Sequence, residues 1–350
     1  MFKFKRFIID QNGNSLVLVS ISMVTLLAFV GLVVDFSKIY VIKTDLQKAA
    51  NAAVLSGAQE LLTNESNVEG IVDTILMKHD EQDNLESLDI NIEQDVTVSL
   101  NEEVPLSFAK IFGVTSIDVP VDAKAEIKPI GSITGIVPLG IDEQELEFEK
   151  EYILKVGAGS DLAGSDDSNF GNGFFGALDL GGRGASNYEE NLREGYDGVV
   201  EIGDILETKT GNMAQPTLRP IEERINNCDF TLTRFSEIPR DCSRIVLVPV
   251  YRPYNQTGNQ LKEVEVVGFA YFYLAYVGTV DESDDSDNSG NNGNGNGNGN
   301  GNNGNGNGNN GNGNGKAYVT GQFIAYAGTG STNDGDDVVS FGAYGIRLTD

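Results

Sequence analysis

The chain has 350 residues, of which 52 are acidic and 24 basic, so its formal net charge is −28 at pH 7. A surface of that sign repels phosphate, which argues against a nucleic-acid partner, because such binding needs clustered Lys or Arg. One histidine and two cysteines nearly exclude chemistry that relies on His or Cys clusters. The sequence therefore predicts no metal site and no cofactor and assigns no catalytic residue, while chemistry that uses carboxylates alone stays open.

Residues 15–34, SLVLVSISMVTLLAFVGLVV, carry no charge. As a helix that rises 1.5 Å per residue they extend about 30 Å, the thickness of a bilayer core. They predict a transmembrane helix that is kept as an anchor. The alternative is a cleaved signal peptide, but its apolar region is shorter and a small-residue cleavage site follows it at once.

The orientation of this span is predicted from the charges before it, which are Lys3, Lys5, Arg6 and Asp10. The positive-inside tendency keeps residues 1–14 in the cytoplasm. The prediction is a single-pass protein of the cell membrane with its C-terminal region extracellular.

The helix is expected to continue outward from the span as far as Leu62. Small and apolar residues recur there at three- and four-residue spacings, as in an amphipathic helix. We call them the small-residue stripe: Ile42, Leu46, Ala49, Ala50, Ala53, Gly57 and Leu61. Two partners for the stripe stay open at this point. It packs either on other subunits, which would include self-association through the N-terminal helix, or on the sheet of its own chain.

A longer pattern covers the span and the stripe together: Gly13-Asn14, Gly31, Val34-Asp35, Tyr40, Leu46-Gln47, Ala49-Ala50-Asn51-Ala52-Ala53, Leu55 and Gly57-Ala58. It resembles the N-terminal region of TadE/TadG-like proteins of the Flp (Tad) pilus assembly system. Residues 104–127, VPLSFAKIFGVTSIDVPVDAKAEI, also resemble the segment that follows in many TadG-like chains. The resemblance implies a pilin-like stalk and partners among other Tad pilus or platform subunits.

Two features depart from the family. Prepilin-peptidase substrates have a Glu five residues after the cleavage Gly, but Leu18 stands five residues after Gly13, so processing there stays open. The Asp-x-Ser-x-Ser metal motif of larger members is missing, so their adhesion mechanism is not carried over.

Residues 35–128 are predicted to add a small α+β unit to the extended helix. A capping box at Ser66 and Glu69 predicts the start of a second helix. Alternating apolar residues predict strands over 88–100 and 116–127. Between the strands a short helix is expected around Phe108 and Phe112, which Pro105 opens and Gly113 closes.

Residues 129–350 are predicted to form a β-rich extracellular domain, a sandwich or barrel, so that the fold class is α+β. Strands are expected over 244–251, 263–277, 317–327 and 338–348, around an aromatic core of Phe269, Phe272, Phe323 and Phe341. Residues 281–315 form an acidic and Asn/Gly-rich insertion, predicted to be a disordered, overgrown hairpin loop. Asp285 and Asp287 imitate half of a calcium loop, but a solvated linker is favoured.

Two further segments of this region are read separately. Cys228 and Cys242 are expected to form an extracytoplasmic disulfide, with two unpaired buried thiols as the alternative. The glycine-rich stretch 171–198 contains no phosphate-binding fingerprint, and no role is assigned to it.

Three functions are carried forward. The leading one is a non-enzymatic, membrane-anchored component of Flp/Tad-type pilus assembly that presents a β-rich domain outside the cell. The second is a membrane-tethered surface adhesin or binding protein without a pilus. The third is a carboxylate-dependent cell-wall hydrolase, with Asp166, Glu189 and Asp204 as unranked candidate acids.

Overall fold

The computed structural model describes residues 14–148, 150–156, 176–182, 184–209, 213–230, 238–257, 260–280, 316–333, 335 and 339–349. The chain divides into two compact units. Unit 1 comprises Met1–Ile127 and Ile346–Asp350, and unit 2 comprises Lys128–Gly345. Both contain helices and strands, so the predicted α+β class is confirmed.

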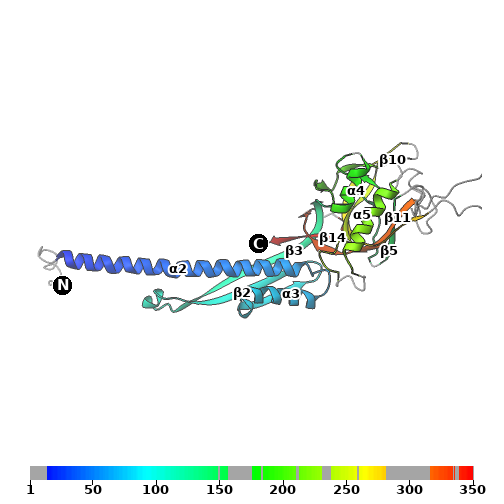
Figure 1. Ribbon diagram of the computed structural model, residues 1–350. Helices are drawn as coiled ribbons and strands as arrows, with labels where there is room; N and C mark the ends of the chain where they lie inside the picture. Colours follow the sequence, from blue (N-terminus) through cyan, green and yellow to red (C-terminus); the bar gives the residue numbers. More distant parts are fainter. Residues whose placement is uncertain are drawn as a thin grey trace, which may run out of the picture. The chain divides into compact units, whose positions relative to one another are not determined.

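Unit 1 begins with one long helix, α2 (Asn14–Ala58), which joins the span and the stripe without a break (Figure 1). Its 45 residues extend about 68 Å at 1.5 Å per residue. Hydroxyl groups inside the apolar part are satisfied locally, because Ser20 and Thr25 donate to the carbonyl groups four residues earlier. The predicted continuous helix is confirmed, although it ends at Ala58 and not at Leu62.

A second helix, α3 (Glu65–Lys78), packs against α2 through Val68, Val72 and Leu76. The predicted capping box is wrong. The helix starts one residue before Ser66, because the Asn64 side chain caps it by accepting a hydrogen bond from the Asn67 N–H at 2.9 Å.

The alternating segment 88–100 forms a hairpin of two strands. A short 3₁₀ helix, η1 (Gln82–Asn84), leads into β1 (Leu85–Asn91), which pairs antiparallel with β2 (Asp95–Pro105). Strand structure in this segment is therefore confirmed. The tight turn between the two strands at Glu93, whose φ is 64°, was not predicted.

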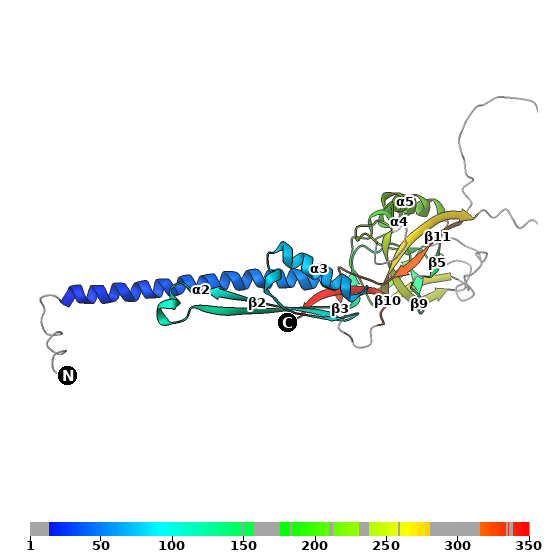
Figure 2. The same ribbon diagram turned by 90° about the horizontal axis from the view of Figure 1, so that it is seen from below.

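The next strand, β3 (Ser116–Ile133), pairs antiparallel with β2 from Asp95↔Glu126 to Pro105↔Ser116. The connection between them holds a second 3₁₀ helix, η2 (Ala109–Phe112), which Gly113 closes in the left-handed conformation, φ 92°. Pro105 ends β2 and does not open this helix. Figures 1 and 2 both show the β2–β3 hairpin alongside α2.

Two short strands, β12 (Tyr326–Gly328) and β14 (Ala343–Thr349), complete this sheet in the order β1-β2-β3-β14-β12, with β7 (Val200–Glu201) and β13 (Ser331–Thr332) paired to β3. Both β3 and β14 have residues in each unit. Within unit 1, Arg347 Nη2 lies 2.6 Å from Glu126 Oε1.

Unit 2 is built on a second sheet with the order β4-β9-β10-β11-β5, in which the long β10 is strongly curved (Figure 2). β6 and β8 extend this sheet through β10. Its strands are β4 (Ile141–Asp142), β5 (Glu151–Val156), β6 (Leu178–Asp179), β8 (Ile205–Thr208), β9 (Ile245–Thr257), β10 (Gln260–Val280) and β11 (Lys316–Ile324). All four predicted aromatic core residues are buried. The rings of Phe272 and Phe323 lie 4.9 Å apart, edge to face.

Two helices of unit 2 were not predicted, α4 (Ala185–Glu194) and α5 (Ala214–Asn227). α5 packs on β10 and β11, and Ile221 is buried there. Tyr188 of α4 is buried beside Thr217 of α5, with 3.0 Å between their hydroxyl oxygens. The glycine-rich stretch 171–198 thus contains a helix, although residues 171–175 and 183 are outside the described ranges.

The insertion at 281–315 lies outside the described residues, as do Asp285 and Asp287. The strands on either side of it are described, and they pair antiparallel out to Val280↔Lys316. The insertion therefore joins two adjacent strands. In the same unit a disulfide links Cys228 and Cys242.

Candidate functional site

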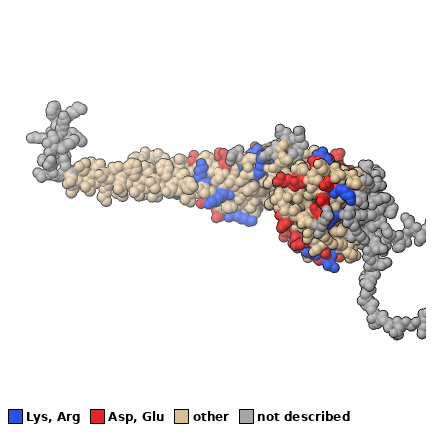
Figure 3. All heavy atoms as spheres, turned by 90° about the horizontal axis from the view of Figure 1, so that it is seen from above, with Lys and Arg blue, Asp and Glu red and all other residues tan. Residues whose placement is uncertain are grey.

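The span is apolar and uncovered in unit 1. Leu16 is 74% exposed and Phe29 66% exposed, and the first half of α2 shows no charged side chain on the face drawn in Figure 3. Such a helix is long and apolar enough to cross a membrane. Its exposed apolar surface would be costly in water, so it suggests membrane anchoring.

The small-residue stripe is covered by unit 1 itself. Leu46, Ala49, Ala50, Ala53 and Leu61 are fully buried, Gly57 is buried and Ile42 is partly buried. The stripe packs against α3 and β2. A Cβ atom at Gly57 would lie 2.8 Å from Cγ2 of Val72, which explains why that position has no side chain. The sequence left two partners open for the stripe, other subunits or the chain's own sheet. In the structure the stripe packs on elements of its own chain.

Asp35, the first residue after the span, holds the β2–β3 connection against α2. The N–H of Ser107 donates to its Oδ1 at 2.9 Å, and the N–H groups of Phe108 and Ala109 donate to its Oδ2 at 2.9 and 2.7 Å. These donors precede or open η2, so they have no partner inside that short helix. Asp35 is 4% exposed. We call this arrangement the Asp35 clasp.

Two residues on α2 extend the clasp. Gly31 lies one turn before Asp35, and a Cβ atom there would lie 2.4 Å from Cδ1 of Phe108 and 2.8 Å from its Cβ. Glycine is therefore needed for Phe108 to rest on the helix backbone. On the other side, Lys38 Nζ donates to the Pro105 carbonyl at 2.9 Å. One face of α2 thus contacts the β2–β3 connection at three positions, Gly31, Asp35 and Lys38.

The same contacts set the charge state of Asp35. The hydrogen bond from the Ala109 N–H is the strongest influence and lowers the pKa of Asp35; burial opposes it. The N–H groups of Ser107 and Phe108 and the charge of Lys38 lower the pKa further. The carboxylate therefore stays ionised in the clasp.

Only an indirect signal for the clasp is present in the sequence. Gly31 and Asp35 entered as parts of the family pattern, without a role. Their spacing of four residues places them on one helix face, and Asp35 is the first charge after the span. What the sequence could not give was the partner, because Ser107–Ala109 are about seventy residues away.

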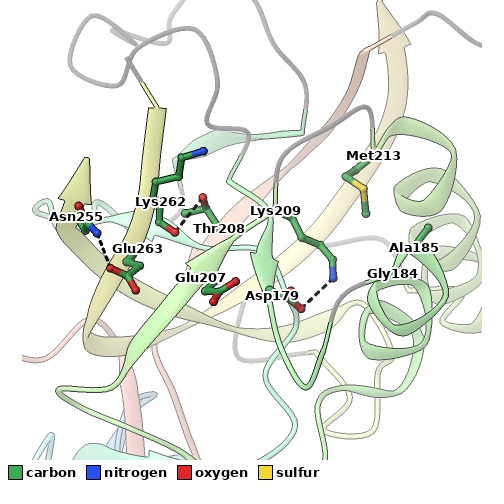
Figure 4. Close-up of a pocket in the computed structure, with 10 residues that line it drawn as sticks. All are labelled: Asp179, Gly184, Ala185, Glu207, Thr208, Lys209, Met213, Asn255, Lys262 and Glu263. Atoms are coloured by element: carbon green, nitrogen blue, oxygen red, sulfur yellow. Dashed lines mark hydrogen bonds and ion pairs between the residues drawn. The ribbon is translucent and has the colours of Figure 1, made fainter. Parts of the chain in front are cut away.

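A polar pocket in unit 2 is the second candidate site, lined by Asp179, Gly184, Ala185, Glu207, Thr208, Lys209, Met213, Asn255, Lys262 and Glu263 (Figure 4). Lys209 Nζ lies 3.0 Å from Asp179 Oδ1 and also donates to the Gly182 carbonyl. Asn255 Nδ2 donates to Glu263 Oε2 at 2.8 Å. Lys209 and Asp179 neutralise each other, and the Glu263 carboxylate accepts a hydrogen bond from the uncharged Asn255 amide, so the pocket has the features of a structural polar cluster.

Two of the three candidate hydrolase acids lie in the described part of the chain, and each contacts a neighbouring residue. Asp166 is outside it. Glu189 Oε1 lies 3.5 Å from Arg219 Nη1, and Asp204 Oδ2 accepts the Glu201 N–H at 2.9 Å. Among the described residues, no three His, Cys, Asp or Glu side chains gather as ligands for a metal ion.

The exposed span, the covered stripe and the clasp together define a class: membrane-anchored proteins in which one long helix continues from the bilayer into a small α+β unit. Residues 13–60 match the family model of the TadE/G-like Flp pilus-assembly proteins, Tad. The match contains Gly31, Asp35 and most of the stripe, and it confirms the resemblance predicted for this segment. Searches of curated proteins and of solved structures found no match.

Proposed function

We propose that the chain is a non-enzymatic, single-pass component of Flp (Tad) pilus assembly. The match of residues 13–60 carries this proposal, since it supports involvement in Flp pilus assembly. The exposed apolar half of α2 supports membrane anchoring. In the proposed topology the N-terminus is cytoplasmic and unit 2 is presented outside the cell.

In this function the two halves of α2 make different contacts. The half beyond Asp35 is used inside unit 1, where α3 and β2 cover the stripe. Contacts with other Tad subunits, or with a second copy, are therefore assigned to the exposed span. Its exposed residues include Leu18, Leu26 and Phe29.

Deletion of the gene tests the proposed function. Cells without the chain should lose Flp pili from their surface in electron micrographs, and the full-length chain should restore them. Normal piliation in the deletion strain would overturn the proposal. As a second readout, a photo-crosslinking residue at Leu26 should capture a Tad subunit or a second copy, whereas the same residue at the exposed Tyr254 of unit 2 is the control.

Protease accessibility tests the orientation. The positive flank of the span predicts that protease added to intact spheroplasts degrades everything after about Lys43. Protection of unit 2 would contradict the proposed topology, while leaving membrane anchoring itself in place.

A further inference from the structure

The tip of the β2–β3 hairpin, residues 106–114, exposes large apolar side chains. Ile111 is 81% exposed and Phe112 66% exposed, and Val114 is exposed beside them. No acidic residue occurs between Glu103 and Asp118, although the chain as a whole is strongly acidic. The only charge in the tip is Lys110. An exposed apolar patch of this kind is typical of a surface that contacts a membrane or another protein.

The clasp fixes the level of this tip along α2. Phe108 rests on Gly31, which belongs to the apolar span, and Ser107–Ala109 bind Asp35, the first residue after the span. At 1.5 Å per residue, Gly31 lies about 6 Å to the membrane side of Asp35. Along the axis of α2, the tip therefore lies beside the C-terminal end of the apolar span.

Seven of the nine backbone N–H groups in the tip donate to acceptors within unit 1. Asp35 accepts three of its N–H groups, and the N–H groups of Leu106, Ile111, Gly113 and Val114 donate to the carbonyls of Thr115, Phe108, Lys110 and Ala109. Backbone groups near lipid need such partners, because hydrocarbon offers no hydrogen bonds.

We propose that the hairpin tip enters the outer interfacial layer of the same bilayer that α2 spans, as a second membrane contact of the chain. Ile111, Phe112 and Val114 would lie at the boundary of headgroups and acyl chains, as apolar side chains of interfacial segments do. Lys110 would reach the lipid phosphates, since long basic side chains extend to the headgroup layer. This inference rests on the membrane anchoring in the proposed function.

The chain contains no tryptophan, so single-tryptophan variants of the full-length protein report on one position each. Three are compared in phosphatidylcholine vesicles: Phe112→Trp in the tip, Phe29→Trp in the span and Tyr254→Trp in unit 2, all at exposed aromatic positions. Phe112→Trp should emit at shorter wavelength than Tyr254→Trp. It should lose most of its emission when the lipids carry bromine high on the acyl chains, and less when the bromine is deep.

The outcomes separate the two proposals. If Phe29→Trp is not quenched by brominated lipid, membrane anchoring fails. If Phe29→Trp is quenched but Phe112→Trp responds only to aqueous iodide, the tip lies in water and this inference alone is overturned. If neither bromine nor iodide reaches Phe112→Trp, another protein surface covers the tip, which overturns the inference as well.

A charge in the tip provides a second test. Ile111→Glu, made in the Phe112→Trp chain, should abolish most of the quenching by brominated lipid, because a carboxylate is disfavoured at that depth. Leu348→Glu changes an exposed leucine of the same unit and should leave the quenching unchanged. Equal quenching in both charge variants would overturn the proposal.

Discussion

Asp35 shows how a single side chain can hold a long hairpin at a membrane helix. Its two carboxylate oxygens accept three N–H groups from consecutive residues, and it is nearly buried. Hydrogen bonds to a charged acceptor are stronger than neutral ones, and donors that lose this acceptor are left unpaired. Asp35, which follows the span in the family pattern, is therefore also the hydrogen-bond acceptor that holds the hairpin.

Replacement of Asp35 tests that role. Asp35→Ala leaves three backbone donors without an acceptor, so the full-length protein in detergent should melt at a lower temperature when followed by circular dichroism. Asp45→Ala is the matched control, because Asp45 is exposed on the same helix and forms a surface ion pair with Lys48 at 3.1 Å. Equal melting of both variants would show that the clasp does not contribute to stability.

The lowered pKa of Asp35 predicts a pH dependence with a definite sign. Because the folded chain binds this proton less readily than the unfolded chain, the clasp stabilises the fold above the ordinary aspartate value of about 3.9. That contribution is lost as the pH falls through the lower folded-state pKa. The difference in melting temperature between wild type and Asp35→Asn should therefore narrow on acidification. A difference that stays constant would contradict the assignment.

Gly31 gives a second prediction for the clasp. Gly31→Ala places a Cβ atom against Phe108 and should destabilise unit 1 by about 1 to 3 kcal/mol through overpacking, reduced by a gain of up to about 1 kcal/mol in helix propensity. The double variant Gly31→Ala, Phe108→Ala should lose less stability relative to Phe108→Ala than Gly31→Ala loses relative to wild type, because the ring is gone and only the Cβ atom at position 108 still contacts the new methyl group. Additive losses in a thermal-melting cycle would mean that the two residues do not touch.

Among the elements, α2 changes its surroundings at Asp35. Before it the helix is exposed and apolar, and after it the stripe is buried against α3 and β2. Ala53→Leu should therefore destabilise unit 1 by roughly 1 to 3 kcal/mol, since the fully buried position has no room for three more carbons. Val41→Leu, at an exposed position of the same helix, is the control. Normal melting of Ala53→Leu with failed pilus assembly would instead place the stripe between subunits.

The elements differ in how well the sequence predicts them. α2 was predictable because its first half is uncharged over a membrane-spanning length and its second half repeats small and apolar residues at three- and four-residue spacings. β9, β10 and β11 were predictable because their β-branched and aromatic runs are long. The turn at Glu93 was missed because the alternation continues across it. α5 was missed because it contains Pro220, which is unfavourable inside a helix. The clasp itself depends on a contact between distant segments, which no local pattern reveals.

At the scale of the whole molecule, the insertion at 281–315 is the largest segment whose removal can be tested. β10 and β11 pair out to Val280↔Lys316, so a short turn can replace the insertion without changing their register. The melting temperature of the shortened protein should equal that of the full-length protein, because the Asn/Gly tract offers no apolar surface. A large decrease would show that the insertion packs on the fold.

The return of the chain to unit 1 has a consequence for biosynthesis. β14 lies beside β3 in the sheet, and Arg347 pairs with Glu126, yet more than two hundred residues separate the two strands in the chain. The ribosome completes β3 long before β14 is synthesised. Until then the edge of β3 that β14 covers is unpaired, and an unpaired strand edge can pair with the wrong strand. A nascent chain that stops before Ala343 keeps that edge whatever the state of unit 2. The edge of β3 is therefore covered only after β14 has been synthesised.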